Sequence, residues 1–190
     1  PRTSASNSAS ATPSFFYMAY FQNEGVAEAE FEADVRGALR KLYMAASADS
    51  SGRWGNLHKP ADEPMLKGLE DPNPFPAWLN DADIDYYVGE FEKSGFRGPI
   101  NRYRNFERDW AMMGGVEDRR IHQPALFVAG AQDMVLKMFG DGDIAAMTDR
   151  MKEMIPNLQG VHLIPNCGHW TQQETPAETT RILLDWLKAL

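Results

Sequence analysis

Cys167 is the only cysteine among 190 residues, so no disulfide can form within the chain. A lone cysteine is typical of reducing compartments, and with no signal segment at the amino terminus it predicts a cytoplasmic protein. Apolar runs are short, and none approaches the roughly 20 residues that a membrane-spanning helix requires. Positive charge is also scarce, because 19 Lys and Arg face 27 Asp and Glu and give a net charge of −8. Nucleic acids and anionic membranes bind basic surfaces, so both are excluded as partners.

Signals for metals, phosphates and nucleophiles are missing as well. The histidines are too scattered for a zinc site, and no glycine-rich loop suits a phosphate. We therefore predict neither a metal nor a cofactor, and we expect Cys167 to be a small packed side chain. The chain begins with Pro1 and contains no recognisable nucleophile, so we expect it to be the later part of a longer chain.

What the sequence does contain is typical of a globular protein, with 43% hydrophobic and 11% aromatic residues. Residues 1–14 are mostly Ser, Ala, Thr, Asn and Pro and predict a flexible linker. The aromatic cluster at residues 15–22 predicts a strand or a turn that fills a core. A long loop over residues 47–78 follows the first helical stretch, and loops of this length often cover a site.

Helical periodicity is clear in three stretches before residue 115. A single helix is expected over residues 26–46, with Phe31 and Leu39 on its apolar stripe. Asn80 or Asp81 can cap a second helix, whose apolar residues are Ile84, Tyr87, Val88 and Phe91. A third helix begins at Pro99, and its shared apolar face is expected to contain Ile100, Tyr103 and Trp110.

The last third of the chain alternates strands and helices. Apolar runs at residues 125–130 and 160–165 predict two buried strands, each followed by an amphipathic helix, and this order indicates part of a parallel sheet of the α/β class. Asp143 can cap the first helix and Thr175 or Pro176 begins the last. The expected buried faces are Ile144, Met147, Met151 and Met154 in the first helix and Ile182, Leu183, Trp186 and Leu187 in the second.

An acid and a histidine follow these two strands. Asp133 lies just beyond the first strand and His169 just beyond the second, the order of acid and base in an α/β-hydrolase triad. Ligands of open α/β sheets bind at the carboxyl ends of the strands, where both residues lie. We therefore predict that Asp133 orients and charge-stabilises the imidazole and that His169 acts as a general base.

Several motifs resemble the soluble epoxide hydrolases of the α/β-hydrolase superfamily. They are Ser94-Gly95-Phe96-Arg97-Gly98-Pro99-Ile100-Asn101-Arg102-Tyr103-Arg104-Asn105, Asn166-Cys167-Gly168-His169-Trp170-Thr171-Gln172, Tyr17-Met18-Ala19-Tyr20-Phe21-Gln22 and Gly25-Val26-Ala27-Glu28-Ala29-Glu30. The resemblance covers nearly everything from Phe15 to Leu190. It implies an α/β-hydrolase fold in which residues 15–115 are a helical cap and residues 116–190 the C-terminal part of the core.

The resemblance also implies a site and a reaction. Tyr17 and Tyr103 match the two cap tyrosines that bind the epoxide oxygen and supply a proton. An upstream Asp, absent from this chain, forms an alkyl–enzyme ester that water activated by His169 hydrolyses to a vicinal diol. The substrate would be a small apolar epoxide, as in a detoxification enzyme, and a homo-oligomer stays open. By the same matching, the apolar pocket would include Val135, Leu136 and Trp170.

Alternatives remain at this point. A haloalkane dehalogenase or a serine esterase would share the acid–histidine pair, but the first needs halide-binding groups and the second a nucleophilic serine. From another class, the chain could be an inactive fragment or a partner that keeps the cap for binding. The family's nucleophile and oxyanion segment are absent here, so we expect the chain alone to be inactive and to require the upstream half of the hydrolase core.

Overall fold

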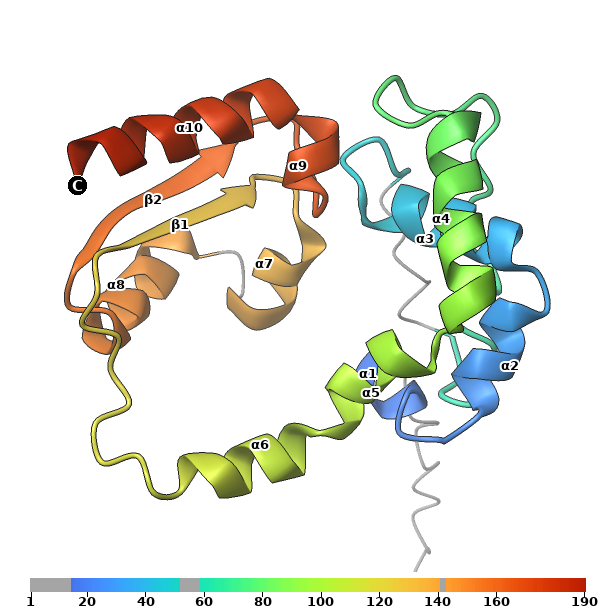
Figure 1. Ribbon diagram of the computed structural model, residues 1–190, viewed down its shortest axis with the longest axis horizontal. Helices are drawn as coiled ribbons and strands as arrows, with labels where there is room; N and C mark the ends of the chain where they lie inside the picture. The colour runs from blue at the N-terminus through green and yellow to red at the C-terminus, as the bar shows by residue number, and fades with distance from the viewer. Residues whose placement is uncertain (1–14, 52–58, 141–142) are drawn as a thin grey trace, which may run out of the picture.

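The computed structural model describes residues 15–51, 59–140 and 143–190. The linker predicted for residues 1–14 lies outside this range. Two parts lie side by side in Figure 1, a helical part and a part with two strands. The helical part contains α1 (Tyr17–Tyr20), α2 (Val26–Glu32), α3 (Val35–Ala46), α4 (Asp81–Ser94), α5 (Arg97–Arg104) and α6 (Phe106–Met113). The strand part contains β1 (Ala125–Gly130), α7 (Met134–Gly140), α8 (Ile144–Met154), β2 (Leu158–Ile164), α9 (Thr171–Glu174) and α10 (Pro176–Ala189).

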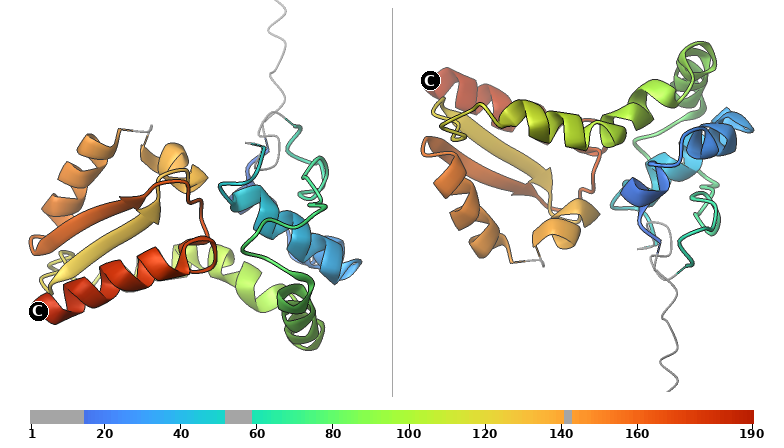
Figure 2. Two further views of the ribbon diagram at one scale, coloured as in Figure 1. Left: turned by 90° about the horizontal axis from the view of Figure 1, so that it is seen from above. Right: turned by 90° about the horizontal axis from the view of Figure 1, so that it is seen from below.

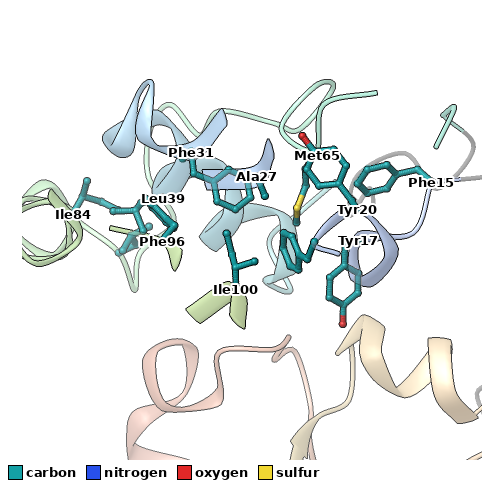
Figure 3. Close-up of a cluster of buried hydrophobic side chains, with 13 residues drawn as sticks. Phe15, Tyr17, Tyr20, Ala27, Phe31, Leu39, Met65, Ile84, Phe96 and Ile100 are labelled. Atoms are coloured by element: carbon teal, nitrogen blue, oxygen red, sulfur yellow. The ribbon is translucent and has the colours of Figure 1, made fainter. Parts of the chain in front are cut away.

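The helical part has an aromatic core drawn from distant segments. Phe31 of α2 lies at its centre, with its ring centroid 6.2 Å from Phe21 and 5.3 Å from Phe96. Edge-to-face pairs of this kind contribute beyond the area they bury. Figure 3 shows the cluster, whose buried members are Phe15, Tyr17, Tyr20, Phe21, Ala27, Phe31, Ala38, Leu39, Met65, Leu79, Ile84, Phe96 and Ile100.

The predicted helix over residues 26–46 is wrong as a single element. It is divided into α2 and α3, because the side chain of Asp34 accepts a hydrogen bond from the backbone N–H of Gly37 at 2.9 Å and caps a new helix. The apolar stripe survives the break, since Phe31 and Leu39 are both buried. The break changes the direction of the chain without moving the stripe out of the core.

The aromatic cluster of residues 15–22 fills the core as predicted, but as one helical turn at Tyr17–Tyr20 and not as a strand. Tyr17, Tyr20 and Phe21 are all buried, and their spacing of three and four residues places them on one side of a helical turn. High aromatic content favours strands, but here the spacing determines the structure. The short helix α1 results.

The helix predicted from Pro99 onward is broken at Asn105, between α5 and α6. Ile100 is buried as expected, but Trp110 is 68% exposed and α6 buries none of its residues. The expected common face is therefore wrong, because α6 leaves the aromatic core and runs along one side of the molecule toward the strand part (Figure 1). By contrast, Asn80 caps α4 as predicted, accepting the N–H of Asp83 at 3.1 Å.

The two predicted strands form a parallel pair. β1 is hydrogen-bonded to β2 with Phe127 opposite Val161 and Gly130 opposite Ile164. Figure 2 shows α10 on one face of the pair and α7 and α8 on the other, the layering of α/β proteins. Asp143 caps α8 and Pro176 is the first residue of α10, both as predicted.

The helix faces predicted to be buried in this part are covered only in part: Ile182 is buried, whereas Ile144, Met147, Met151 and Trp186 are half-buried. Met154 is 48% and Leu187 55% exposed, and Leu183 is exposed too. The connected buried cluster of the strand part consists of Ile164, Cys167 and Ile182, and Ala129 and Leu136 are buried outside it. The described residues contain only two strands. This narrow sheet cannot cover the whole apolar faces of α8 and α10. Within the described part of the chain, no helix is both long and apolar enough to cross a membrane.

Candidate active site

Asp133 and His169 meet at the carboxyl ends of the two parallel strands. Nδ1 of His169 lies 3.0 Å from Oδ2 of Asp133. The approach requires Gly130 at the end of β1, because a Cβ there would lie 2.0 Å from the carbonyl oxygen of Gly168. The backbone of Gln132 also donates to the carbonyl of Cys167 at 2.9 Å. The loop after β2 is thus packed directly onto the loop after β1.

The contacts of Asp133 set the electrostatics of the pair. Its Oδ1 accepts the backbone N–H of Val135 at 2.8 Å, which leaves Oδ2 for the imidazole. The hydrogen bond to Asp133 raises the pKa of His169 above its usual value, and partial burial opposes that change. Because Nδ1 is occupied, Nε2 is the nitrogen that can exchange a proton with a reacting group.

Two tyrosines of the helical part form a second pair. The rings of Tyr17 (α1) and Tyr103 (α5) lie 5.6 Å apart at 83°. Figure 3 shows the hydroxyl of Tyr17 pointing out of the aromatic core toward the strand part. Burial, followed by the nearby Tyr103 and the negative charge of Asp133, raises the pKa of Tyr17 to about 12. This phenol therefore keeps its proton at neutral pH and can act as a donor.

An apolar cavity of about 310 Å³ lies beside the tyrosine pair. Of the three residues expected to line a substrate pocket, Trp170 lies here. Val135 and Leu136 instead line a separate hollow with the methionines of α8. The cavity wall is formed by Tyr17, Phe21, Phe31, Leu39, Leu42, Tyr43, Met65, Phe91, Phe96, Pro99, Ile100, Tyr103 and Trp170.

Tyr43 was missed by the sequence analysis. Its ring stacks on Tyr87 at 5.1 Å and contacts Trp170 at 4.7 Å, so it connects the cavity to the residue after His169. Its sequence position, next to the stripe residue Leu42 near the end of a helix, resembles that of any half-buried aromatic. Only the approach of the loop after β2 gives it a place in the site.

The remaining candidate groups belong to other roles. Burial raises the pKa of the Cys167 thiol, and the hydroxyl of Thr175 donates to its sulfur at 3.3 Å, as suits a packed side chain. Nε2 of His122 is hydrogen-bonded to Oδ2 of Asp118 at 2.7 Å. No cluster of three or more His, Cys, Asp or Glu suited to a metal occurs in residues 15–51, 59–140 and 143–190.

The chain is similar to proteins that are called epoxide hydrolases. No protein-family model matches the chain. It is 44% identical over 197 residues to Epoxide hydrolase B of Mycobacterium tuberculosis (strain ATCC 25618 / H37Rv), covering 92% of this chain and 54% of that protein. Epoxide hydrolase A of the same organism is 36% identical over 178 residues, covering 93% and 53%.

A solved structure is similar over the same extent. The epoxide hydrolase from an endophytic Streptomyces superposes with a TM-score of 0.82 at 38% identity, over 94% of this chain and 53% of that one. The chain thus spans about half the length of the curated relatives described above.

Proposed function

Because the chain belongs to the α/β-hydrolase epoxide hydrolase family, as a C-terminal portion of it, we propose that it supplies the base and the oxygen-binding tyrosines of an epoxide hydrolase. The complete protein would open an epoxide to a vicinal diol. The observation that carries the proposal is the Asp133–His169 hydrogen bond at the strand ends, on the side toward which the hydroxyl of Tyr17 points (Figure 3).

In the first step, a carboxylate oxygen of an upstream Asp attacks an epoxide carbon, and the carbon–oxygen bond of the ring breaks. An alkoxide is a poor leaving group near neutral pH, so its oxygen must receive a proton as the bond breaks. Tyr17 and Tyr103 are the proposed donors. Their rings are in contact, with centroids 5.6 Å apart, and both line the same cavity.

In the second step, Nε2 of His169 takes a proton from water and the resulting hydroxide attacks the carbonyl carbon of the alkyl–enzyme ester. The ester bond breaks, the diol leaves and the Asp carboxylate is restored. The proton on His169 then passes through solvent to the tyrosinate left by the first step, which closes the cycle. Asp133 stabilises the imidazolium formed in this step, which agrees with the raised pKa of His169. Upstream backbone amides would hold the oxyanion.

The remaining assignments follow from this proposal. Residues 15–115 act as the cap over the site, and residues 116–190 complete the core together with an upstream half. Trp170 and the cavity beside it would bind the apolar arm of the epoxide. Val135 and Leu136 remain proposed substrate contacts by the family resemblance, although here they line the separate hollow next to α8. The proposed compartment is the cytoplasm, as suits a protein with one buried cysteine.

A pair of variants in the complete protein tests the two steps separately. His169→Gln should slow ester hydrolysis by about 10²–10⁴-fold, the usual contribution of a general base, so that intact mass spectrometry after mixing with an aryl epoxide shows protein plus one epoxide. Tyr103→Phe should slow the appearance of that adduct instead. His162→Gln, a change on the exposed face of β2, is the matched control and should turn over normally.

Absence of a trapped adduct in His169→Gln would contradict the covalent mechanism. The tyrosine variant separates the rival hydrolases, because a dehalogenase or a serine esterase has no epoxide oxygen for Tyr103 to protonate. If Tyr103→Phe leaves ring opening unchanged, the tyrosine pair has no role in the reaction. If it impairs epoxide opening alone, the epoxide hydrolase assignment stands against both rivals.

A further inference from the structure

The loop that carries His169 has neither helix nor strand between β2 and α9, so other contacts must hold it in place. The backbone N–H of His169 donates to the carbonyl of Ala46 at the end of α3, at 2.9 Å. Nε1 of Trp170 donates to the carbonyl of Tyr43 at 2.8 Å. The loop that carries His169 is therefore hydrogen-bonded to the last turn of α3 in the helical part.

Glu174 provides the third connection, and it is the most extensive. One carboxylate oxygen accepts the backbone N–H of Gly168 at 2.8 Å and that of Ala48 at 2.9 Å. The other accepts the N–H of Trp170 at 2.9 Å. Hydrogen bonds to a carboxylate are among the strongest in proteins. Among the described residues, no basic side chain is paired with Glu174, so backbone amides satisfy its charge.

We propose that Glu174 is a positioning residue for His169. Its carboxylate holds the peptide plane that follows His169, through the N–H of Trp170, and the plane that precedes Gly168, through the N–H of Gly168. The plane between Gly168 and His169 is held by the hydrogen bond from His169 to Ala46, so Glu174 fixes the backbone on both sides of the histidine. By binding Ala48 as well, it fixes that backbone relative to α3 and the cavity. This inference rests on the proposed function, in which Nε2 of His169 must reach a water molecule held beside the ester.

The packing around Gly168 leaves little slack. A Cβ at this position would lie 2.5 Å from the backbone nitrogen of Ala48 and 2.7 Å from the carbonyl oxygen of Ala46. The two backbones are therefore in direct contact at the point where Glu174 joins them. A general base acts over hydrogen-bond distances of about 2.6–3.2 Å, and a displacement of about 1 Å can cost 10²-fold in rate.

The test is the ratio of the rate of ester hydrolysis to the rate of ring opening, measured in the complete protein. Glu174→Gln places an amide NH₂ where an oxygen accepts backbone N–H groups, so at least one bond is lost. We expect ester hydrolysis to slow by about 10–100-fold while ring opening keeps its rate, so that the ester accumulates. A merely structural defect lowers the amount of active protein and reduces both steps alike.

Glu178→Gln is the matched control. It makes the same change of charge one turn later, at a carboxylate that pairs with Arg181 on the surface, and it should leave the ratio at the wild-type value. If Glu174→Gln also leaves the ratio unchanged, the positioning role is overturned while the epoxide hydrolase proposal stands. Should Glu174→Gln not fold, Glu174→Asp keeps the charge with a shorter reach and is judged by the same ratio.

If the wild-type protein forms no ester, the proposed function fails, and amide hydrogen exchange then decides about Glu174. Exchange at Gly168 and Trp170 that is faster in Glu174→Gln than in Glu178→Gln supports the holding role. Equal exchange in the two variants overturns it.

Discussion

The helical part and the strand part of this molecule differ in how much core they contain. The helical part buries a cluster that runs from Phe15 to Ile100 and draws on α1, α2, α3, α4, α5 and the long loop. The strand part buries Ile164, Cys167 and Ile182, and its last helix exposes Leu183 and Leu187. The helical part therefore obtains its cohesion from its own side chains, whereas the strand part has amphipathic helices but only two strands for them to cover.

The candidate site lies where these two parts meet. Asp133 and His169 come from the weakly packed part, and Tyr17 and Tyr103 come from the strongly packed part. The loop contacts of Glu174 and Trp170 with residues 43–48 join the two. These contacts hold the loop that carries His169 against the well-packed helical part as well as against its own strands.

The largest expected effect tests the difference in cores. Phe31→Ala removes a ring that is 2% exposed, and we expect a loss of about 3–5 kcal/mol in the free energy of unfolding, as for other buried aromatic residues. Leu187→Ala, at a side chain 55% exposed, should cost less than about 0.5 kcal/mol. Denaturant unfolding of the two variants measures both. Equal losses would show that Leu187 is covered in the complete protein.

A smaller effect is expected at the junction. Gly168→Ala places a Cβ against the backbone of Ala46 and Ala48, and overpacking of this kind costs about 1–3 kcal/mol. Because the displaced loop carries His169, ester hydrolysis should slow with it. Gly89→Ala in α4, where a Cβ would meet nothing within 4 Å, is the control and should be neutral or stabilising. A stable, fully active Gly168→Ala variant would mean that the two parts are not in tight contact here.

The smallest expected effect is a change in pH dependence. Asp133 raises the pKa of His169. If His169 is the base, as proposed, ester hydrolysis in the complete protein should accelerate as the pH rises through that raised value, because the neutral imidazole then forms. Asp133→Asn removes the charge that stabilises the imidazolium, so the pKa of His169 should fall. The rise of the ester hydrolysis rate with pH should then occur at lower pH. NMR titration of the His169 ring measures the direction. Asp143→Asn, at a carboxylate that caps α8, should leave the titration unchanged.

The sequence predicted those features that depend on residues close together in the chain. β1 has the predicted bounds, Asn80 and Asp143 cap their helices, and Asp133 and His169 follow consecutive strands. Parallel strands end at the same edge, so the meeting of these two side chains also followed from the order of the elements. The pairing of Tyr17 with Tyr103 had no such local signal and was expected only through the family resemblance.

The features that the sequence could not predict depend on contacts between distant segments. Trp110 leaves the core because the chain breaks at Asn105, and Tyr43 joins the site through Trp170. Contacts between distant segments leave no repeating pattern of apolar residues in the sequence. Each depends on which surfaces the tertiary structure brings together. The break at Asp34 is different, because it rests on a local cap to Gly37 that the apolar stripe concealed.

By itself, the sequence determined the two strands, the caps of α4 and α8, and the order of acid and base, since periodicity, capping and side-chain type are local properties. Only the tertiary structure decided how firmly the base is held. Glu174 meets the backbone of Ala48 across 126 positions of the chain, and the carboxylate has this role because folding brings three otherwise unpaired amides to one point.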